Sequence, residues 1–201
     1  MKDIYRDMQA RSALAVWQRG VLAAGWLGFL VCLGWAWMTS AVLAWVAAGL
    51  CAGGGHVMVL AFELVCVRAV HRDDPAPKAG WRELARAWWT EVGWSSRVFG
   101  WQQPFAWRRQ ADTAEPMPGR RAVVLVHGFI CNRGFWLPWL ERLSARGVPY
   151  VTVNLEPVFG PIDAYVPRIE AAVRRAEALT GEPPLLVGHS MGGLVIRAWM
   201  A

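Results

Sequence analysis

Residues 187–193 of this chain read Val187-Gly188-His189-Ser190-Met191-Gly192-Gly193. An apolar run precedes this stretch, and an apolar segment with helical spacing follows it, at 194–200. A serine with a glycine two residues away on either side, between a strand and a helix, is typical of a tight turn that lifts the hydroxyl clear of a sheet. Only hydrogen side chains fit at Gly188 and Gly192 in such a turn. We therefore expect Ser190 to be a nucleophile.

Strands and helices alternate before this serine, starting at residue 121. A continuous apolar, β-branched run at 122–126 predicts a strand buried on both faces. The next two strands are predicted over 148–154 and 185–187. Helices are predicted over 134–146 and 162–180, the second capped by Asp163 and ended by Gly181. This alternation predicts a parallel sheet whose ligands gather at the carboxyl ends of the strands. His127-Gly128-Phe129 and Ser190 both follow such strands.

Acyl transfer from an ester needs a nucleophile, a base that takes its proton, and donors for the oxyanion that forms. The backbone N–H of Met191 is one expected donor, because it stands at the positive end of a helix dipole. The N–H of Phe129 is the second, since Gly128 lets the chain turn toward the pocket.

Together, the His-Gly pair and the Gly-His-Ser-Met-Gly-Gly stretch resemble the α/β-hydrolase superfamily, and are most similar to bacterial lipases and carboxylesterases of triacylglycerol-lipase type. The resemblance covers about Arg121 to Ala201. It implies an α/β fold in which this segment forms the amino-terminal part of an α/β-hydrolase parallel sheet. It implies a nucleophilic Ser190, an oxyanion hole from Phe129 and Met191, and elbow and loop glycines at Gly128, Gly188 and Gly192. It also implies that neither His127 nor His189 is the base.

The sequence departs from this superfamily after the serine. The triad order is serine, then Asp or Glu, then His, but neither an acid nor a histidine follows Ser190 before the chain ends at Ala201. We expect the amino-terminal part of a hydrolase, either a truncated product or an incomplete sequence, that is nearly inactive by itself. A rearranged triad could draw on Asp163 and His127, although structural roles are expected for both.

The apolar excess of the chain is local. Apolar residues make up 55% of the sequence, and no Asp, Glu, Lys or Arg occurs between Val21 and Phe62. A helix needs roughly 20 apolar residues to cross a bilayer, whereas the apolar region of a signal peptide is only roughly 7–15 residues long. We expect a membrane anchor over 1–72, with a polar helix to Arg19 and then a transmembrane hairpin of two helices, about 21–38 and 41–66, joined at Thr39-Ser40.

Positive charge flanks both open ends of this hairpin. Arg19 precedes the first helix, and Arg68, His71 and Arg72 follow the second. The positive-inside rule then places both ends in the cytoplasm of a bacterial-type inner membrane, as a multi-pass protein with a cytoplasmic hydrolase part. The net charge of +6 comes mostly from scattered arginines, which favours attraction to anionic lipid over nucleic acid binding.

Residues 73–120 are expected to link the anchor to a partial hydrolase domain over 121–201. Residues 73–77 predict a linker and cap. Apolar side chains then recur at helical spacing at Trp81, Leu84, Ala85, Trp88 and Val92. This amphipathic helix could lie in the lipid headgroup layer or pack on the hydrolase domain. Residues 100–109 predict a first edge strand.

Three other residues invite functional interpretations. His56, after Gly53-Gly54-Gly55, could be a proton relay or ligand, but a kinked helix that tolerates a histidine is the simpler interpretation. Glu63 could end the second crossing or pair with Arg68. Cys131, beside Asn132, could be a nucleophile, yet no activating group is adjacent, so we expect loop packing. The cysteine spacing predicts neither a disulfide nor a metal site, and no cofactor is expected.

The leading hypothesis is a membrane-anchored serine hydrolase that cleaves a lipid or other carboxylic ester through a Ser190 acyl-enzyme. Its expected partners are that ester and the membrane. An acyltransferase or thioesterase on the same fold is the second hypothesis. The third is a non-catalytic, membrane-bound remnant.

Overall fold

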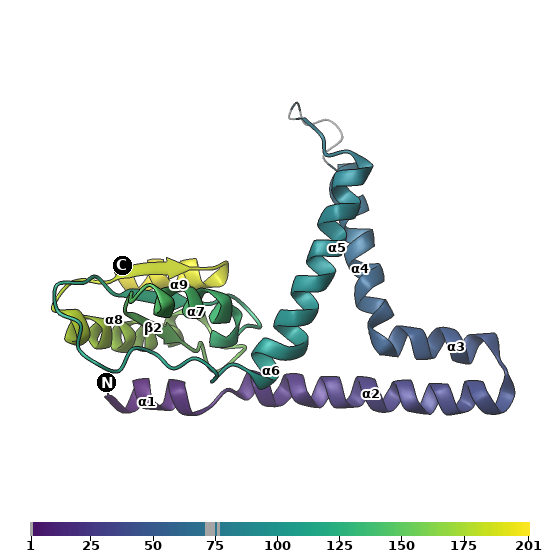
Figure 1. Cartoon of the computed structure of the whole chain (residues 1–201), viewed down its shortest axis with the longest axis horizontal. Coiled ribbons are helices and arrows are strands. Elements are labelled where there is room, and N and C mark those ends of the chain that lie inside the picture. Colours follow the sequence, from purple (N-terminus) through teal and green to yellow (C-terminus); the bar gives the residue numbers. More distant parts are fainter. Residues whose placement is uncertain (1, 71–74, 76) are drawn as a thin grey trace. The chain divides into compact units, whose positions relative to one another are not determined.

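The computed structural model describes residues 2–70, 75 and 77–201 (Figure 1). The chain forms two compact units: residues up to Arg19 together with Trp101–Ala201, and Gly20–Gly100. This division differs from the expected boundaries at 72 and 120. The amino-terminal residues belong to the unit that contains Ser190, because they pack on its core.

A three-stranded parallel sheet forms the centre of the first unit. Its strands are β1 (Val123–Val126), β2 (Tyr150–Val153) and β3 (Leu185–Gly188), in the order β2-β1-β3. Val123 of β1 pairs with Tyr150 on one side and with Leu185 on the other. The prediction of a parallel sheet is confirmed.

Helices cover both faces of this sheet. Val124 and Val126 are in the larger core cluster, with residues of α8 (Val166–Thr180) and α9 (Met191–Met200). Leu125, between them in β1, points to the opposite face and clusters with Trp136 and Leu140. Leu140 is in α7 (Leu137–Ala145). The alternation of side chains along β1 thus produces a three-layer α/β arrangement.

Short 3-10 turns precede both α7 and α8: η3 (Arg133–Trp136) and η4 (Ile162–Tyr165). The expected cap at Asp163 is wrong. Pro161 and Tyr165 hold the N-cap positions of η4 and α8, and neither helix has a side-chain cap. A proline in the first turn of α8 has no N–H, so one fewer donor needs a cap. Gly181 ends α8 at φ 76°, as expected.

The amino-terminal segment forms α1 (Lys2–Ala10) and the start of α2 (Ala13–Thr39), so the expected single helix to Arg19 is interrupted. Met8 of α1 is buried in the larger core cluster. The Asn154 side chain donates a hydrogen bond to the Met8 carbonyl at 2.8 Å, and the Ser12 hydroxyl accepts one from the Ala15 N–H at 3.2 Å. These bonds attach the segment to the end of β2 and start α2.

The expected edge strand at 100–109 is wrong. This segment contains η2 (Val98–Gln102), a π-helical stretch, and the helical turn α6 (Gln103–Phe105). Gln103 is fully buried, and its side-chain oxygen accepts the Asn132 N–H at 3.1 Å. A buried glutamine that satisfies a loop amide favours this compact turn over a strand at the sheet edge.

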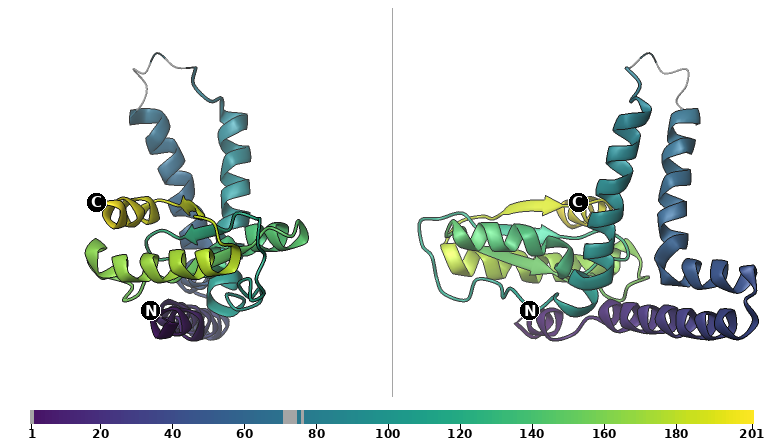
Figure 2. Two further views of the ribbon diagram at one scale, coloured as in Figure 1. Left: turned by 90° about the vertical axis from the view of Figure 1, so that its left-hand side faces the viewer. Right: turned by 45° about the vertical axis from the view of Figure 1, so that its right-hand side comes forward.

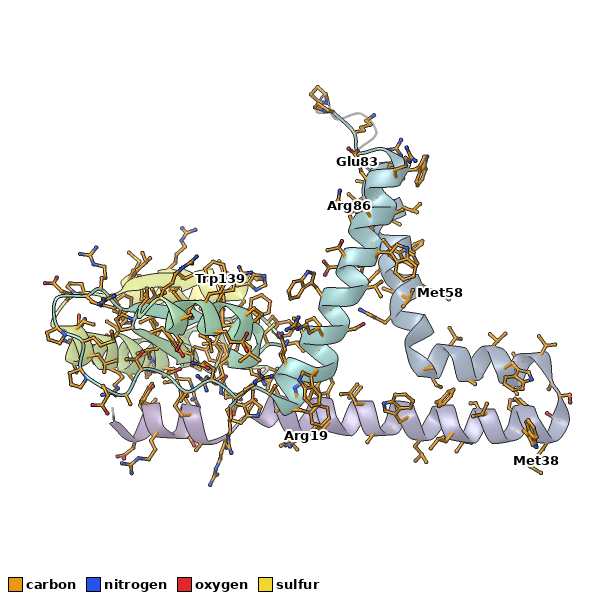
Figure 3. All side chains as sticks on the ribbon, in the orientation of Figure 1. Arg19, Met38, Met58, Glu83, Arg86 and Trp139 are labelled. Atoms are coloured by element: carbon orange, nitrogen blue, oxygen red, sulfur yellow. The ribbon has the colours of Figure 1, made fainter. Side chains whose placement is uncertain are left out.

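Two apolar helical stretches have little burial; the first begins in the Ser190 unit and continues into the second unit, and the other lies in the second unit. Asp3–Thr39 and Val42–Val70 are long and apolar enough to be candidate membrane spans, and 6% and 0% of their most apolar windows are buried. A core helix of a soluble domain would be mostly buried. Figure 3 shows the apolar side chains along them, including Met38 and Met58. Ser40, at φ 54°, forms the expected turn after α2.

The second expected crossing, 41–66, is not one straight helix. It consists of α3 (Val42–Gly49), the π-helical η1 (Leu50–Gly54) and α4 (Gly55–Val70). Gly53 has φ 105°, which breaks the helix and turns α4 away from α3 (Figure 2). The expected kink in this glycine run is confirmed. α4 continues beyond Glu63, so Glu63 does not end it.

The amphipathic helix is α5 (Trp81–Arg97), which lies beside α4 in both views of Figure 2. The Trp88 indole donates a hydrogen bond to the Val57 carbonyl at 3.0 Å. Arg68 bonds the Ala79 carbonyl and stacks on the Trp81 ring at 4.8 Å, so the structure shows no pairing with Glu63. His71, Arg72 and most of the predicted linker and cap lie outside the described residues.

Candidate active site

Ser190 occupies a strained turn between β3 and α9, with φ 52° and ψ −124°. Such a backbone costs a non-glycine residue about 1–3 kcal/mol, and it persists only where the surroundings impose it. Here the atoms around the two flanking glycines leave no room for the turn to relax. A Cβ at Gly192 would lie 2.4 Å from the Val126 carbonyl oxygen, and one at Gly188 would lie 2.8 Å from the Gly193 nitrogen. The Ser190 side chain is exposed at the carboxyl edge of the sheet.

The loop after β1 packs directly on this turn. A Cβ at Gly128 would lie 3.0 Å from Cβ of Ser190 and 3.0 Å from Nδ1 of His189. The His189 N–H donates to the Val126 carbonyl at 3.0 Å, which ties the turn to the end of β1. The two motifs that the sequence separates are therefore in van der Waals contact, as their positions after neighbouring parallel strands predict.

The two expected oxyanion donors are the backbone N–H groups of Phe129 and Met191. Within the described part of the chain, neither the Phe129 N–H nor the Met191 N–H donates a hydrogen bond to another group. Met191 is the first residue of α9, where helical geometry leaves N–H groups free. Met191 follows Ser190 in sequence, and Phe129 follows Gly128, which packs against Ser190.

His127 supports the loop from beneath. It is buried, and its Nε2 accepts the Leu155 N–H at 3.1 Å. The proton must then be on Nδ1, which donates to the Gly128 carbonyl at 2.9 Å. Burial lowers the pKa of His127 to about 4. A neutral ring with both nitrogens engaged orients the Gly128–Phe129 peptide and is not available as a base.

His189 and Cys131 also lack the surroundings of catalytic groups. The exposed His189 ring stacks on Phe135, with ring centroids 4.5 Å apart. Burial raises the pKa of the Cys131 thiol to about 11, which keeps it protonated at neutral pH. The neighbouring Asn132 caps η3 through the Gly134 N–H and donates to the Ser12 hydroxyl at 3.2 Å. These contacts agree with the expected packing role of this loop.

A buried ion pair that the sequence did not indicate holds the far end of the loop. Nη2 of Arg133 lies 2.6 Å from Oδ1 of Asp112, and both side chains are almost fully buried. Arg133 Nε also donates to the Thr152 hydroxyl, and the Tyr5 hydroxyl donates to Oδ2 of Asp112 at 2.7 Å. The network joins α1, β2 and the loop after β1, whose residues are far apart in sequence.

His56 has a partner that the sequence did not reveal. Its Nε2 lies 2.8 Å from the hydroxyl of Ser95, which itself donates to the Glu91 carbonyl at 2.6 Å. The Ser95 hydroxyl proton is thus engaged with the Glu91 carbonyl of α5, and the His56 Nε2–H donates to the Ser95 hydroxyl oxygen. This pair joins α4 to α5 and fits the simpler, structural interpretation of His56. No group of three metal-ligating side chains occurs among residues that the structure describes.

A comparison with protein families found one match in the Ser190 segment. Residues 123–201 match the model of the Alpha/beta hydrolase family. The matched α/β-hydrolase segment begins at the first residue of β1 and includes both motifs around Ser190. Comparisons with curated proteins and with solved structures gave no significant match. The hydrolase-type fold is shown for this segment.

Proposed function

We propose that this protein is a serine hydrolase of lipase or esterase type, held at a membrane by its apolar helices, that cleaves carboxylic esters through an acyl-enzyme on Ser190. One observation carries the proposal. An exposed serine hydroxyl stands in a strained turn against a loop, and the two nearby amides of Phe129 and Met191 have no acceptor within the described chain. That combination suits a developing oxyanion.

The chemistry assigns a role to each group. Oγ of Ser190 attacks the ester carbonyl carbon, its proton passes to solvent water because no described side chain accepts it, and the carbonyl electron pair moves onto oxygen. The Phe129 and Met191 amides donate to that oxyanion. Collapse expels the alcohol, which takes a proton, and water then releases the acid from the acyl-enzyme. Loss of one oxyanion donor typically lowers turnover by about 100- to 1,000-fold.

The apolar helices support the membrane part of the proposal. Both candidate spans are nearly unburied, and a substrate ester dissolved in a bilayer would be close to an enzyme anchored there. We extend the proposal to a multi-pass protein of a bacterial-type inner membrane with Ser190 on the cytoplasmic side. The proposal includes no nucleic acid partner, because the basic residues are mostly arginines scattered along the sequence.

An alkyl fluorophosphonate tests the nucleophile. Because no base activates the Ser190 hydroxyl among the described residues, we expect the full chain in detergent to be labelled at Ser190 slowly, and Ser190→Ala to lose the label. Ser144→Ala, at an exposed serine of α7, is the matched control and should be labelled like the parent. Equal labelling of Ser190→Ala would refute the proposal. Absence of labelling from the parent would favour the non-catalytic remnant.

Turnover by the chain should nevertheless be low. Among the described residues no side chain hydrogen-bonds the Ser190 hydroxyl, and both ring nitrogens of His127 are engaged. Without a base, only the catalysis that comes from binding and the oxyanion hole is left. Stopped-flow mixing with a p-nitrophenyl ester should show no rapid burst, and a burst of one equivalent would contradict this expectation.

A further inference from the structure

An apolar groove lies beside the Ser190 site, in the same compact unit. It has a volume of about 320 Å³ and is lined by Ala13, Leu14, Trp17, Pro157, Val158 and Phe159. The first three residues are at the start of α2, and the others are in the loop that follows β2. No lining side chain carries a charge or a hydrogen-bonding group other than the Trp17 indole N–H. The chemistry of the groove therefore favours hydrocarbon over a polar headgroup.

The groove is continuous with the loop that supplies the expected oxyanion donor. Phe159 contacts Phe129 edge to face, with ring centroids 5.8 Å apart. Phe129 follows Gly128, which packs against Ser190. Phe159 is 71% exposed and Phe129 is 50% exposed. An apolar path thus runs from the Ser190 site across two exposed rings into the groove.

Hydrogen bonds hold both walls in place. The Ala13 N–H donates to the Glu156 carboxylate at 2.7 Å, which joins the start of α2 to the loop after β2. The Tyr165 hydroxyl accepts the Gly160 N–H at 2.9 Å and donates to the Pro157 carbonyl at 2.7 Å. Leu14, in the α2 wall, is almost fully buried. A groove with fixed walls binds a ligand without first having to order them.

We propose that this groove binds the hydrocarbon chain of the substrate, the acyl chain whose carbonyl is attacked by Ser190. The assignment of that ester rests on the proposed function, whereas the binding of a chain rests on the groove itself. An apolar cavity of about 150 Å³ holds benzene, so a groove of twice that volume holds a chain of roughly a dozen carbons. Affinity should rise roughly fourfold for each buried methylene until the groove is filled.

A photoreactive fatty acid tests the proposal without requiring catalysis. The probe is dodecanoic acid with a diazirine at its terminal carbon, photolysed with the full chain in lipid nanodiscs. Trypsin releases both walls as separate peptides, 12–19 and 147–168, and a reference peptide, 134–142, that carries the exposed Trp139 (Figure 3). We expect adducts on both wall peptides to exceed those on the reference peptide at least fivefold.

Two variants locate the binding. Ala13→Trp fills the groove from one wall, and Phe159→Asp puts a charge on an exposed position of the other. Each should lower the adducts on both wall peptides at least fivefold, whereas Trp139→Ala should change neither. Because Phe159 is so exposed, Phe159→Asp remains informative if Ala13→Trp fails to fold.

The outcomes separate this proposal from the function proposed for Ser190. Ser190→Ala should keep the wall adducts, so their persistence without fluorophosphonate labelling would support the groove and refute the hydrolase. Adducts on 12–19 alone, unchanged by either groove variant, would show partitioning of the probe into bilayer around α2 and would overturn the proposal. Equal adducts on all three peptides would also overturn it.

Discussion

The backbone N–H of Leu155 donates a hydrogen bond to Nε2 of His127 at 3.1 Å. Leu155 follows β2 and His127 follows β1, so this bond joins the carboxyl ends of neighbouring strands beneath the Ser190 site. It also fixes the ring proton on Nδ1, which donates a hydrogen bond to the Gly128 carbonyl at 2.9 Å. The imidazole therefore sets the loop geometry without joining the reaction.

This arrangement predicts acid sensitivity. Burial lowers the pKa of His127 from 6.5 to about 4, so the unfolded chain binds this proton more readily than the folded one. The stabilising contribution is complete above pH 6.5 and is lost as the pH falls toward 4, by about 3 kcal/mol in total. Thermal unfolding followed by near-ultraviolet circular dichroism should show this loss.

His127→Gln is the control for that experiment. Glutamine can still accept the Leu155 N–H through its side-chain oxygen but does not titrate. The difference in unfolding free energy between the parent and this variant should therefore change with pH between 6.5 and 4. A difference that stays constant across this range would contradict the assignment of a neutral, buried His127.

Substitution by alanine should have different effects on protein stability at two neighbouring glycines. Gly192→Ala would place a methyl group 2.4 Å from the Val126 carbonyl oxygen, whereas nothing lies within 4 Å of a Cβ at Gly193. We expect Gly192→Ala to destabilise the protein by about 1–3 kcal/mol and to reduce labelling of Ser190. Gly193→Ala should be neutral or slightly stabilising, because alanine favours the helix. Similar unfolding temperatures for both variants would argue against the tight turn.

Removal of Asp112 should be costly. Its carboxylate is almost fully buried against Arg133 and also accepts the Tyr5 hydroxyl, so Asp112→Ala leaves a buried guanidinium without its counter-ion. Loss of one partner from such a pair costs about 3–5 kcal/mol. Urea unfolding should detect it. Glu177→Ala, which breaks a solvent-exposed pair with Arg174, should cause little measurable change, and equal losses for both variants would contradict this ranking.

Membrane orientation is open to a direct test. A reporter enzyme that is active only in the periplasm, fused after Ala201, should stay inactive in a bacterial host, because positive residues flank the open ends of the apolar region. The same reporter fused after Ser40, in the turn between α2 and α3, should be active. The reverse pattern would overturn the proposed cytoplasmic side for Ser190.

Much of the sheet and of the Ser190 turn could be predicted from local patterns. The apolar runs located β1, β2 and β3 to within a few residues. β1 is almost entirely buried, as its continuous apolar sequence predicts, whereas Leu185 of β3 is exposed. The glycines around Ser190 indicated a turn that excludes a Cβ, and Gly53–Gly55 indicated the kink before α4. Prediction was wrong at 100–109, where a buried glutamine bonds a loop amide that is distant in sequence.

By itself, the sequence determined the short strands of a parallel sheet, the two apolar regions and the serine between its glycines. Each of these features depends on residues that are neighbours in the chain. Only the tertiary structure decided that α1 belongs with the Ser190 unit, that Asp112 neutralises Arg133, and that Trp17 and Phe159 line one groove. These contacts join segments separated by twenty to about 140 residues. No local periodicity encodes such pairings, because they arise only when the folded layers bring distant side chains together.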